Sequence, residues 1–143
     1  MSYQRVSLLV ATRKRPGYLK KFLDSYYATT QGSGDCEIVF RVDYDDPESI
    51  QMLAEFGFLT VVGPRRNGYR SLPSFYNEMA RLATGDILFA VNDDVLIETP
   101  GWPRLVIEAA NRYPDGIFNF GVSTVMHEDN YVFPCVSRKL GKH

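Results

Sequence analysis

The 143-residue sequence has little of several features that would place it in a specialised class of protein. Its two cysteines, Cys36 and Cys135, form no CxxC pair and no metal-binding spacing, so we expect buried free thiols in a reducing compartment. No apolar run approaches the roughly 20 residues of a membrane-spanning helix. The apolar stretch at 6–11 is too short for the core of a signal peptide. These absences predict a cytoplasmic protein with no membrane span.

Charge of one sign is not in excess either. The chain has 16 Lys and Arg against 17 Asp and Glu, a net charge of -1, which argues against a general nucleic-acid-binding surface. The content of 45% hydrophobic and 23% charged residues is that of an ordinary globular protein. A chain of this length buries a core without disulfides or metals. With no repeat or linker in the sequence, we expect one domain spanning residues 1–143.

Several motifs of nucleotide-binding and hydrolytic proteins are absent. No GxGxxG follows the first expected strand, and the chain has neither a GxxxxGK[ST] loop nor a GxSxG elbow. Its two histidines, His127 and His143, form no HExxH pair. A functional site in this chain must therefore be made of carboxylates, arginines and backbone groups.

The pattern that is present alternates β-rich and helical segments. Strands are expected at residues 5–11, 37–42, 58–62, 86–91, 117–125 and 131–135. Helices are expected to open at Pro16, at Pro47 behind the N-cap Asp46, near Leu72, and at Thr99 and Pro100. This alternation predicts an α/β fold, with a mainly parallel sheet and helices on both of its faces.

Helix ends and faces follow from the same pattern. The second helix is expected to end near Phe56, and Gly85 is expected to terminate the third. The apolar face of the first helix is expected at Leu19, Phe22, Leu23, Tyr26 and Tyr27. That of the last helix is expected at Trp102, Leu105, Val106, Ala109, Ala110 and Tyr113.

Polar residues gather where the expected strands end, at 12–15, 43–46, 65–70 and 92–94. Ligands of open parallel sheets bind beyond the carboxyl ends of the strands, so these clusters indicate one site. Asn92, Asp93 and Asp94 offer the oxygen ligands that Mg²⁺ or Mn²⁺ prefers, although the same residues also form ordinary turns and helix caps.

The remaining clusters have two interpretations each. Thr12, Arg13 and Arg15 suit a nucleotide or phosphate, as do the arginines at 65, 66 and 70, but solvated basic loops have the same composition. Asp43 and Asp45 suit a base or ribose, but they also suit a capped loop.

Four segments together resemble the family 2 glycosyltransferases with the GT-A fold. They are the stretch RVSLLVATRKRP at 5–16, EIVFRVD at 37–43, the stretch from Asn67 through Asn77 to Phe89, and Asn92-Asp93-Asp94 in place of a DxD motif. The resemblance covers residues 5–110, and its specificity comes from the order and spacing of the four segments.

The resemblance implies a Rossmann-like GT-A sheet, a nucleotide-diphosphate-sugar donor and Mn²⁺ or Mg²⁺. It also implies an acceptor, whether saccharide, lipid or protein, that the sequence does not identify. The residues transferred to the donor site are Thr12, Arg13, Arg15, Asp43 (on the base), Arg70, Asn77 and Asp93. Those transferred to the metal site are Asp94, Asn92 and, further along the chain, His127.

This sequence departs from the family pattern in two places. Asn92 stands where the motif usually has a leading aspartate, and an amide oxygen is a weaker ligand than a carboxylate. The catalytic base is expected in an acceptor-side segment, where Glu128 and Asp129 are the candidates, unless they belong to a polar hairpin. We expect a donor-binding part, truncated at its C-terminus, whose apolar edge at Tyr131, Phe133 and Leu140 is exposed or covered by a second copy in a homodimer.

Three functions stay open on these observations. The first is an inverting glycosyltransferase, and the second is a nucleotide-sugar-binding module without turnover. The third is a nucleotidyltransferase. That class tends to have a glycine-rich loop with Lys or Arg directly after the first strand, and here the loop has a single glycine, Gly17, so the sequence disfavours it.

Overall fold

A computed structural model describes residues 3–31, 33–65, 72–113, 119–122 and 133–138 of the chain. Its elements, in chain order, are β1 (Val6–Thr12), α1 (Pro16–Thr30), β2 (Cys36–Asp43), α2 (Pro47–Phe56), β3 (Leu59–Gly63), α3 (Leu72–Leu82), β4 (Ile87–Asn92), α4 (Trp102–Ala110), β5 (Asn119–Val122) and β6 (Phe133–Ser137).

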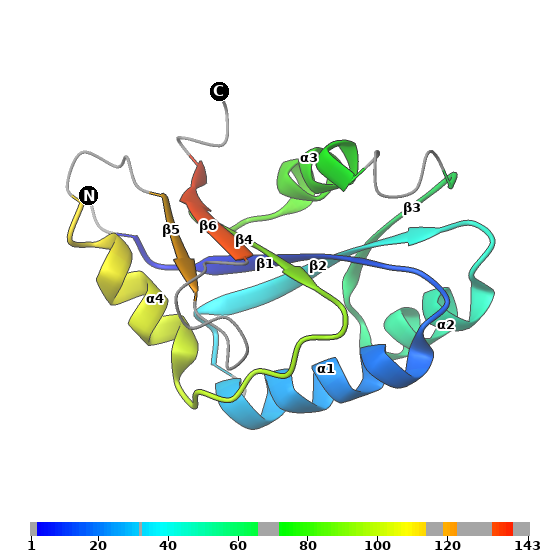
Figure 1. The fold of residues 1–143 in the computed structure, drawn as a ribbon, viewed down its shortest axis with the longest axis horizontal. Coiled ribbons are helices and arrows are strands. Elements are labelled where there is room, and N and C mark those ends of the chain that lie inside the picture. The colour runs from blue at the N-terminus through cyan, green and yellow to red at the C-terminus, as the bar shows by residue number, and fades with distance from the viewer. Residues whose placement is uncertain (1–2, 32, 66–71, 114–118, 123–132, 139–143) are drawn as a thin grey trace.

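The strands form one sheet in the order β3-β2-β1-β4-β6-β5. β1 pairs in parallel with β2 on one side and β4 on the other, and β2 pairs in parallel with β3. β6 runs antiparallel to both β4 and β5 (Figure 1). The predicted α/β fold with a mainly parallel sheet is confirmed, with β6 as the strand that reverses direction.

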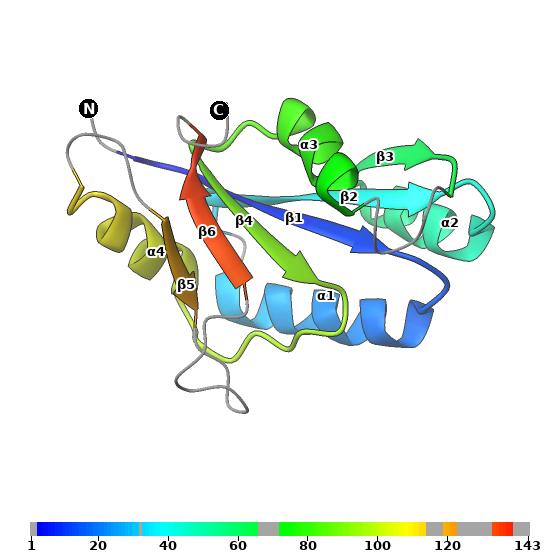
Figure 2. The same ribbon diagram turned by 45° about the horizontal axis from the view of Figure 1, so that its top comes forward.

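The central strand β1 packs against helices on both of its faces. Successive side chains of a strand point to opposite sides of the sheet. Val6, Leu8 and Val10 therefore join the core cluster that contains α1 and α4, whereas Leu9 joins the one that contains α3. Figure 2 shows α3 on one side of the sheet and α1 and α4 on the other. Helices on both faces, as expected, are confirmed.

Local signals set the ends of α1 and α2. Pro16 lies in the first turn of α1, and Gln31 closes that helix in the left-handed conformation with φ 48°. The carboxylate of Asp46 accepts from Ser49 N at 3.3 Å, as an N-cap does, and Gly57 ends α2 with φ 75°. The expected limits of α2 are confirmed. Tyr27, however, is exposed, so the predicted apolar face of α1 is wrong at this position, and the buried face continues from Tyr26 to Thr29 and Thr30.

α4 begins later and faces differently from the prediction. Gly101 has φ 73° and precedes the helix, which starts at Trp102 rather than at Thr99 and Pro100. The buried positions are Trp102, Pro103, Ile107 and Ala110, while Leu105 and Tyr113 are exposed. Trp102 and Ala110 are buried as predicted and Val106 packs against the core, whereas the prediction was wrong for Leu105 and Tyr113, because the buried side is centred on Pro103, Ile107 and Ala110.

Gly85 does not terminate α3, which already ends at Leu82. Instead, Gly85 lies against β1, where its N–H donates to Ser7 Oγ at 2.8 Å. A Cβ at this position would lie 2.4 Å from Ser7 Oγ and 2.8 Å from Ser7 N. A close approach between backbones is a second common use of glycine, and it is the one that applies here.

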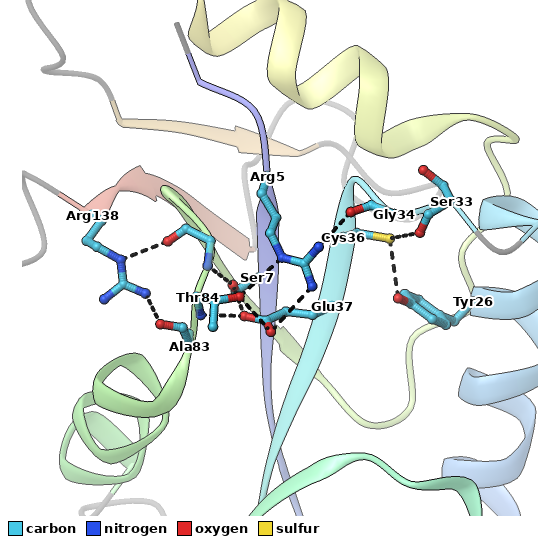
Figure 3. A network of polar contacts seen from close by, with 11 residues as sticks. Arg5, Ser7, Tyr26, Ser33, Gly34, Cys36, Glu37, Ala83, Thr84 and Arg138 are labelled. Carbon is cyan, nitrogen blue, oxygen red and sulfur yellow. Dashed lines mark hydrogen bonds and ion pairs between the residues drawn. The ribbon is translucent and has the colours of Figure 1, made fainter. Parts of the chain in front are cut away.

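A network of polar contacts joins β1, β2 and the loop before β4 at the edge opposite the predicted site (Figure 3). Glu37 accepts from Ser7 Oγ at 2.5 Å and from the N–H and hydroxyl of Thr84 at 2.6 and 3.0 Å. Burial raises the pKa of Glu37, but these hydrogen bonds outweigh it and lower the pKa overall. Arg138, at the end of β6, donates to the carbonyls of Ala80 and Gly85 at 3.0 and 2.7 Å.

Both cysteines are free and buried, as predicted, and burial raises the pKa of the Cys135 thiol to about 12. Within the described parts of the chain, none of the helices combines the length and the apolar character required to cross a bilayer.

Candidate functional site

A cavity of about 430 Å³ opens at the carboxyl edge of the sheet. The strand register accounts for its position, because Ala11 pairs with Asn92 and Thr12 with Val42, which brings the ends of β1, β2 and β4 level. Its lining residues are Ala11, Thr12, Arg13, Arg15, Arg41, Asp43, Arg65, Phe75, Tyr76, Asn92, Asp93 and Asp94. The predicted convergence on one edge is therefore found for members of the clusters at 12–15, 43–46 and 92–94 and for Arg65, whereas residues 66–70 lie outside the described part of the chain.

Asp93 is the buried carboxylate of this cavity, with 5% of its surface exposed. Its Oδ2 accepts from Thr12 Oγ1 at 2.8 Å, and its Oδ1 lies 3.5 Å from Arg15 Nη1. Burial raises the pKa of Asp93 even though the Thr12 hydroxyl and the Arg15 charge oppose that shift. Burial, helped by the Asp93 charge, also raises the pKa of Tyr76. The adjacent Asp94 is half exposed.

Arg15 bridges these two neighbouring acids. Besides its ion pair with Asp93, its Nη2 lies 3.1 Å from Asp94 Oδ2, and its guanidinium lies 4.6 Å from the centre of the Tyr18 ring. Partial burial lowers the pKa of Arg15, but the Asp93 and Asp94 charges outweigh it and raise the pKa overall. Arg15 thus neutralises part of the negative charge that Asp93 and Asp94 bring to the cavity.

A second set of ion pairs ties the loop after β1 to the loop after β2. Arg13 Nη1 lies 3.1 Å from Asp43 Oδ2, and Arg13 Nη2 lies 2.9 Å from Asp45 Oδ2. The hydrogen bond with Arg13 lowers the pKa of Asp45. Lys14 has φ 49°, and its N–H donates to Asp46 Oδ2 at 2.6 Å. Asp46, the N-cap of α2, therefore also holds the loop that follows β1.

Sequence reasoning missed some of the lining residues. Arg41 lies on β2 and is 1% exposed, although its segment was predicted only to form a strand. A charged residue inside a run of buried apolar ones was the signal that could have found it. Phe75 and Tyr76 lie on α3, where they pack in or against the core on that face of the sheet, and both also line the cavity.

One predicted residue, Asn77, is described by the structure and does not line the cavity, while several others lie outside the described residues. Asn77 lies on α3 with an exposed side chain and is not among the lining residues, because one step along a helix turns the side chain about 100° away from Tyr76. Arg70, His127, Glu128 and Asp129 lie outside the described residues, as do Tyr131, Leu140 and the side chain of Phe133.

The oxygens of Asp94 and Asn92 suit a divalent cation that shares its coordination with a ligand. Both residues are exposed at the end of β4, whereas both oxygens of Asp93 are engaged by Thr12 and Arg15. Asp94 Oδ2 pairs with Arg15 as well, so a cation would compete with Arg15 for that oxygen. The described residues contain no group of three or more acidic, His or Cys side chains that would hold a metal unaided. Mg²⁺ and Mn²⁺ sites of one or two protein ligands are completed by water and substrate phosphates, which this donor set fits.

Comparison with known proteins finds similarity in structure but not in sequence. No family model and no curated protein matches this sequence. A mannosyltransferase from Pyrobaculum calidifontis, solved with GDP-Man and Mn²⁺, superposes with a TM-score of 0.72 over 99% of this chain at 16% identity. Residues 1–349 of S. aureus TarS, solved with UDP, superpose with a TM-score of 0.66 over 96% of it at 15% identity. A cytidylyltransferase from Leptospira borgpetersenii gives 0.67 over 98% at 14% identity.

The match covers only part of these proteins. This chain spans 46% of the mannosyltransferase, 48% of the TarS fragment and 63% of the cytidylyltransferase. At identities this low, the similarity concerns the fold and not the reaction. The order of the strands, the helices on both faces and these superpositions together show that the chain has a Rossmann-like α/β fold of the GT-A type.

Proposed function

We propose that this chain binds a nucleotide-diphosphate sugar at the carboxyl edge of its sheet and forms the donor-binding part of an inverting glycosyltransferase. The observation that carries the proposal is the cavity itself. Arginines and carboxylates from the ends of β1, β2 and β4 line one concave site on a GT-A-like sheet. A volume of about 430 Å³ lies within the range of small-molecule sites.

The charges of the cavity suit the two ends of such a donor. Arg13, Arg15 and Arg65 present guanidinium groups, which bind phosphate oxygens in pairs of parallel hydrogen bonds. Asp43, deeper in the cavity and 5% exposed, offers carboxylate oxygens to the N–H groups of a base. We assign the phosphates to the side of Arg15 and Asp94, and the base to the side of Asp43.

Each residue then has a definite task. Thr12 and Arg15 hold Asp93 in place, and Arg13 holds Asp43. Asp94 and Asn92 would hold Mn²⁺ or Mg²⁺ against the phosphates, where the ion supplies charge neutralisation for the departing diphosphate. The base that takes the proton of the acceptor hydroxyl is proposed at Glu128 or Asp129, and a further metal ligand at His127. The cytoplasm is the proposed compartment.

A nucleotidyltransferase is the second candidate, and the comparisons favour it enough to be tested. The cytidylyltransferase superposes about as well as TarS does, and a CMP-2-keto-3-deoxy-manno-octonic acid synthetase solved with CTP superposes with a TM-score of 0.59. A nucleotidyltransferase would release pyrophosphate from CTP and a sugar. A glycosyltransferase would release the nucleoside diphosphate from a nucleotide sugar, and a binding module would leave the donor intact.

Calorimetric titration with UDP, GDP, CDP and ADP, with and without Mn²⁺, tests the proposal. We expect at least one of these nucleotides to bind, and to bind more tightly with Mn²⁺. Asp94→Ala should abolish the Mn²⁺-dependent part and leave the fold intact, because this side chain is 46% exposed. Asp24→Ala is the matched control, since Asp24 is an exposed acid on α1 that pairs with Lys20. No binding by the wild type, or equal binding by Asp94→Ala with Mn²⁺, would refute the proposal.

A further inference from the structure

Arg41 is a buried cation in the middle of a sheet, and the fold alone gives no reason for it. Residues of β2 alternate between the two faces, so Ile38, Phe40 and Val42 enter the core beside α1. Arg41 and Asp43 lie on the opposite face, toward α3. Burying a charge is costly, and replacing a buried ion pair by apolar residues is often neutral or stabilising. A role at the adjacent cavity explains why a guanidinium occupies this position.

The guanidinium of Arg41 makes contacts in several directions. Its Nη1 donates to Asp43 Oδ1, and its Nη2 donates to the carbonyl of Pro64 at 2.8 Å. Its Nε lies 3.6 Å from Glu78 Oε2, and the group lies 4.0 Å from the centre of the Phe75 ring. Arg41 thus links Asp43, the residues that follow β3, and α3.

Asp43 is consequently held from both sides. Arg41 donates to Oδ1 and Arg13 donates to Oδ2, which fixes the plane of the carboxylate. A carboxylate oxygen has the capacity to accept more than one hydrogen bond, so Oδ1 and Oδ2 of Asp43 can also accept from a ligand while the two arginines set their direction. Arg13 is partly exposed and Arg41 is buried, so Arg41 provides the rigid half of this arrangement.

We propose that Arg41 is the positioning residue for nucleotide-base recognition, acting through Asp43. This inference rests on the proposed function of the cavity. A carboxylate of fixed direction discriminates between bases by the position of their N–H donors, because a mismatched base leaves it unpaired. A carboxylate that rotates would accept from several bases alike. The ligand class is therefore a nucleotide whose base presents an N–H group to Asp43.

Gly63 gives a way to disturb Arg41 without removing it. A Cβ on Gly63 would lie 2.6 Å from Arg41 Nη2 and 3.2 Å from its Cζ. Gly63→Ala should therefore push the guanidinium away from its present position and leave its charge in the protein. Gly34→Ala is the matched control, because a Cβ there meets nothing within 4 Å.

The experiment measures two affinities in each variant, one for a series of nucleoside diphosphates and one for inorganic pyrophosphate. Arg41→Met and Gly63→Ala should reduce the discrimination between the best and worst nucleotide from about tenfold or more to about threefold or less. Pyrophosphate affinity should stay within about twofold, because the proposed phosphate contacts are on the side of Arg15 and Asp94. Arg41→Lys should restore part of the discrimination, since it retains a charge but not the planar fork.

Each outcome decides between the alternatives. A wild type that binds no nucleotide refutes the proposed function, and the inference falls with it. A wild type that discriminates while Arg41→Met and Gly63→Ala discriminate equally well refutes the inference alone. If pyrophosphate affinity falls together with nucleotide affinity, Arg41 supports the fold and not the recognition of the base. Arg41→Met should remain folded because Asp43 keeps its ion pair with Arg13. If Arg41→Met does not fold, Gly63→Ala, which retains the arginine, tests the inference in its place.

Discussion

Replacing Gly85 by alanine should destabilise the protein, because this glycine lies in close contact with the backbone of β1. A Cβ there would lie 2.4 Å from Ser7 Oγ, 2.8 Å from Ser7 N and 3.0 Å from the carbonyl oxygen of Arg5. The last two are backbone atoms beside or in β1, which is paired on both sides and has little freedom to shift. Overpacking of this kind costs about 1–3 kcal/mol, and the hydrogen bond from Gly85 N to Ser7 Oγ adds about 1 kcal/mol if it breaks.

We therefore expect Gly85→Ala to lower the free energy of unfolding by about 2–4 kcal/mol. At about 3 °C per kcal/mol for a chain of this size, Tm should fall by roughly 6–12 °C. Urea unfolding followed by circular dichroism measures the first quantity, and Gly34→Ala, with open space around its Cβ, is the control.

A double-mutant cycle with Ser7→Ala separates the two parts of the effect. Without the Ser7 hydroxyl, the contact at 2.4 Å disappears, but the contact with Ser7 N at 2.8 Å remains. Gly85→Ala should then cost less than in the wild type, but still more than zero. A loss of under about 1 kcal/mol in the wild-type background, below the range for overpacking, would show that the two backbones separate easily and would refute this reasoning.

Three further predictions concern charged groups. Arg15→Gln removes the cation that bridges Asp93 and Asp94, so the ligand-free protein should bind Mn²⁺ about fivefold more tightly by EPR titration; unchanged affinity would mean that Arg15 and the metal do not compete. Burial raises the pKa of Asp93 above its unfolded value, so its charge destabilises the fold at neutral pH, and Asp93→Asn should be about 1 kcal/mol more stable at pH 7. That gain should vanish as the pH falls through the raised pKa, and a gain independent of pH would contradict it. The pKa of Glu37 is lowered in the folded protein, so the ionised side chain contributes its full stabilisation above the unfolded pKa and loses it as the pH falls through the folded pKa. Glu37→Gln should therefore lower the free energy of unfolding in urea by about 2 kcal/mol at pH 7 and by less below pH 4.

The position of the site was predictable because it depends on topology. Parallel strands place their carboxyl ends at one edge, so Thr12, Asp43 and Asn92 had to lie together once their strands were identified. Which arginine pairs with which acid was not predictable. Arg13 reaches across to Asp43 while Arg15 turns to Asp93, and that choice depends on the left-handed conformation of Lys14 between them.

Other features could not be predicted from the sequence, for different physical reasons. The start of α4 depends on the left-handed conformation of Gly101, and the presence of a glycine in a sequence does not reveal the sign of its φ. Gly85 resembled a helix terminator because close packing and helix ends both favour glycine. The role of Arg41 was not predicted because it lies among the apolar residues that identify the strand, and only the three-dimensional contacts show what its guanidinium does.

The position of β1 at the centre of the sheet has a consequence for the order of folding. Contacts that join β1 to β2 span 30 residues, as between Arg13 and Asp43, whereas those that join β1 to β4 span 81, as between Thr12 and Asp93. Loop-closure entropy makes the longer connection more costly by about 0.9 kcal/mol. The Arg13–Asp43 side of the cavity should therefore assemble first, and the acids after β4 should arrive at a surface where Arg15 is already present. The cavity is then completed late in folding, by the strand that brings Asp93 and Asp94.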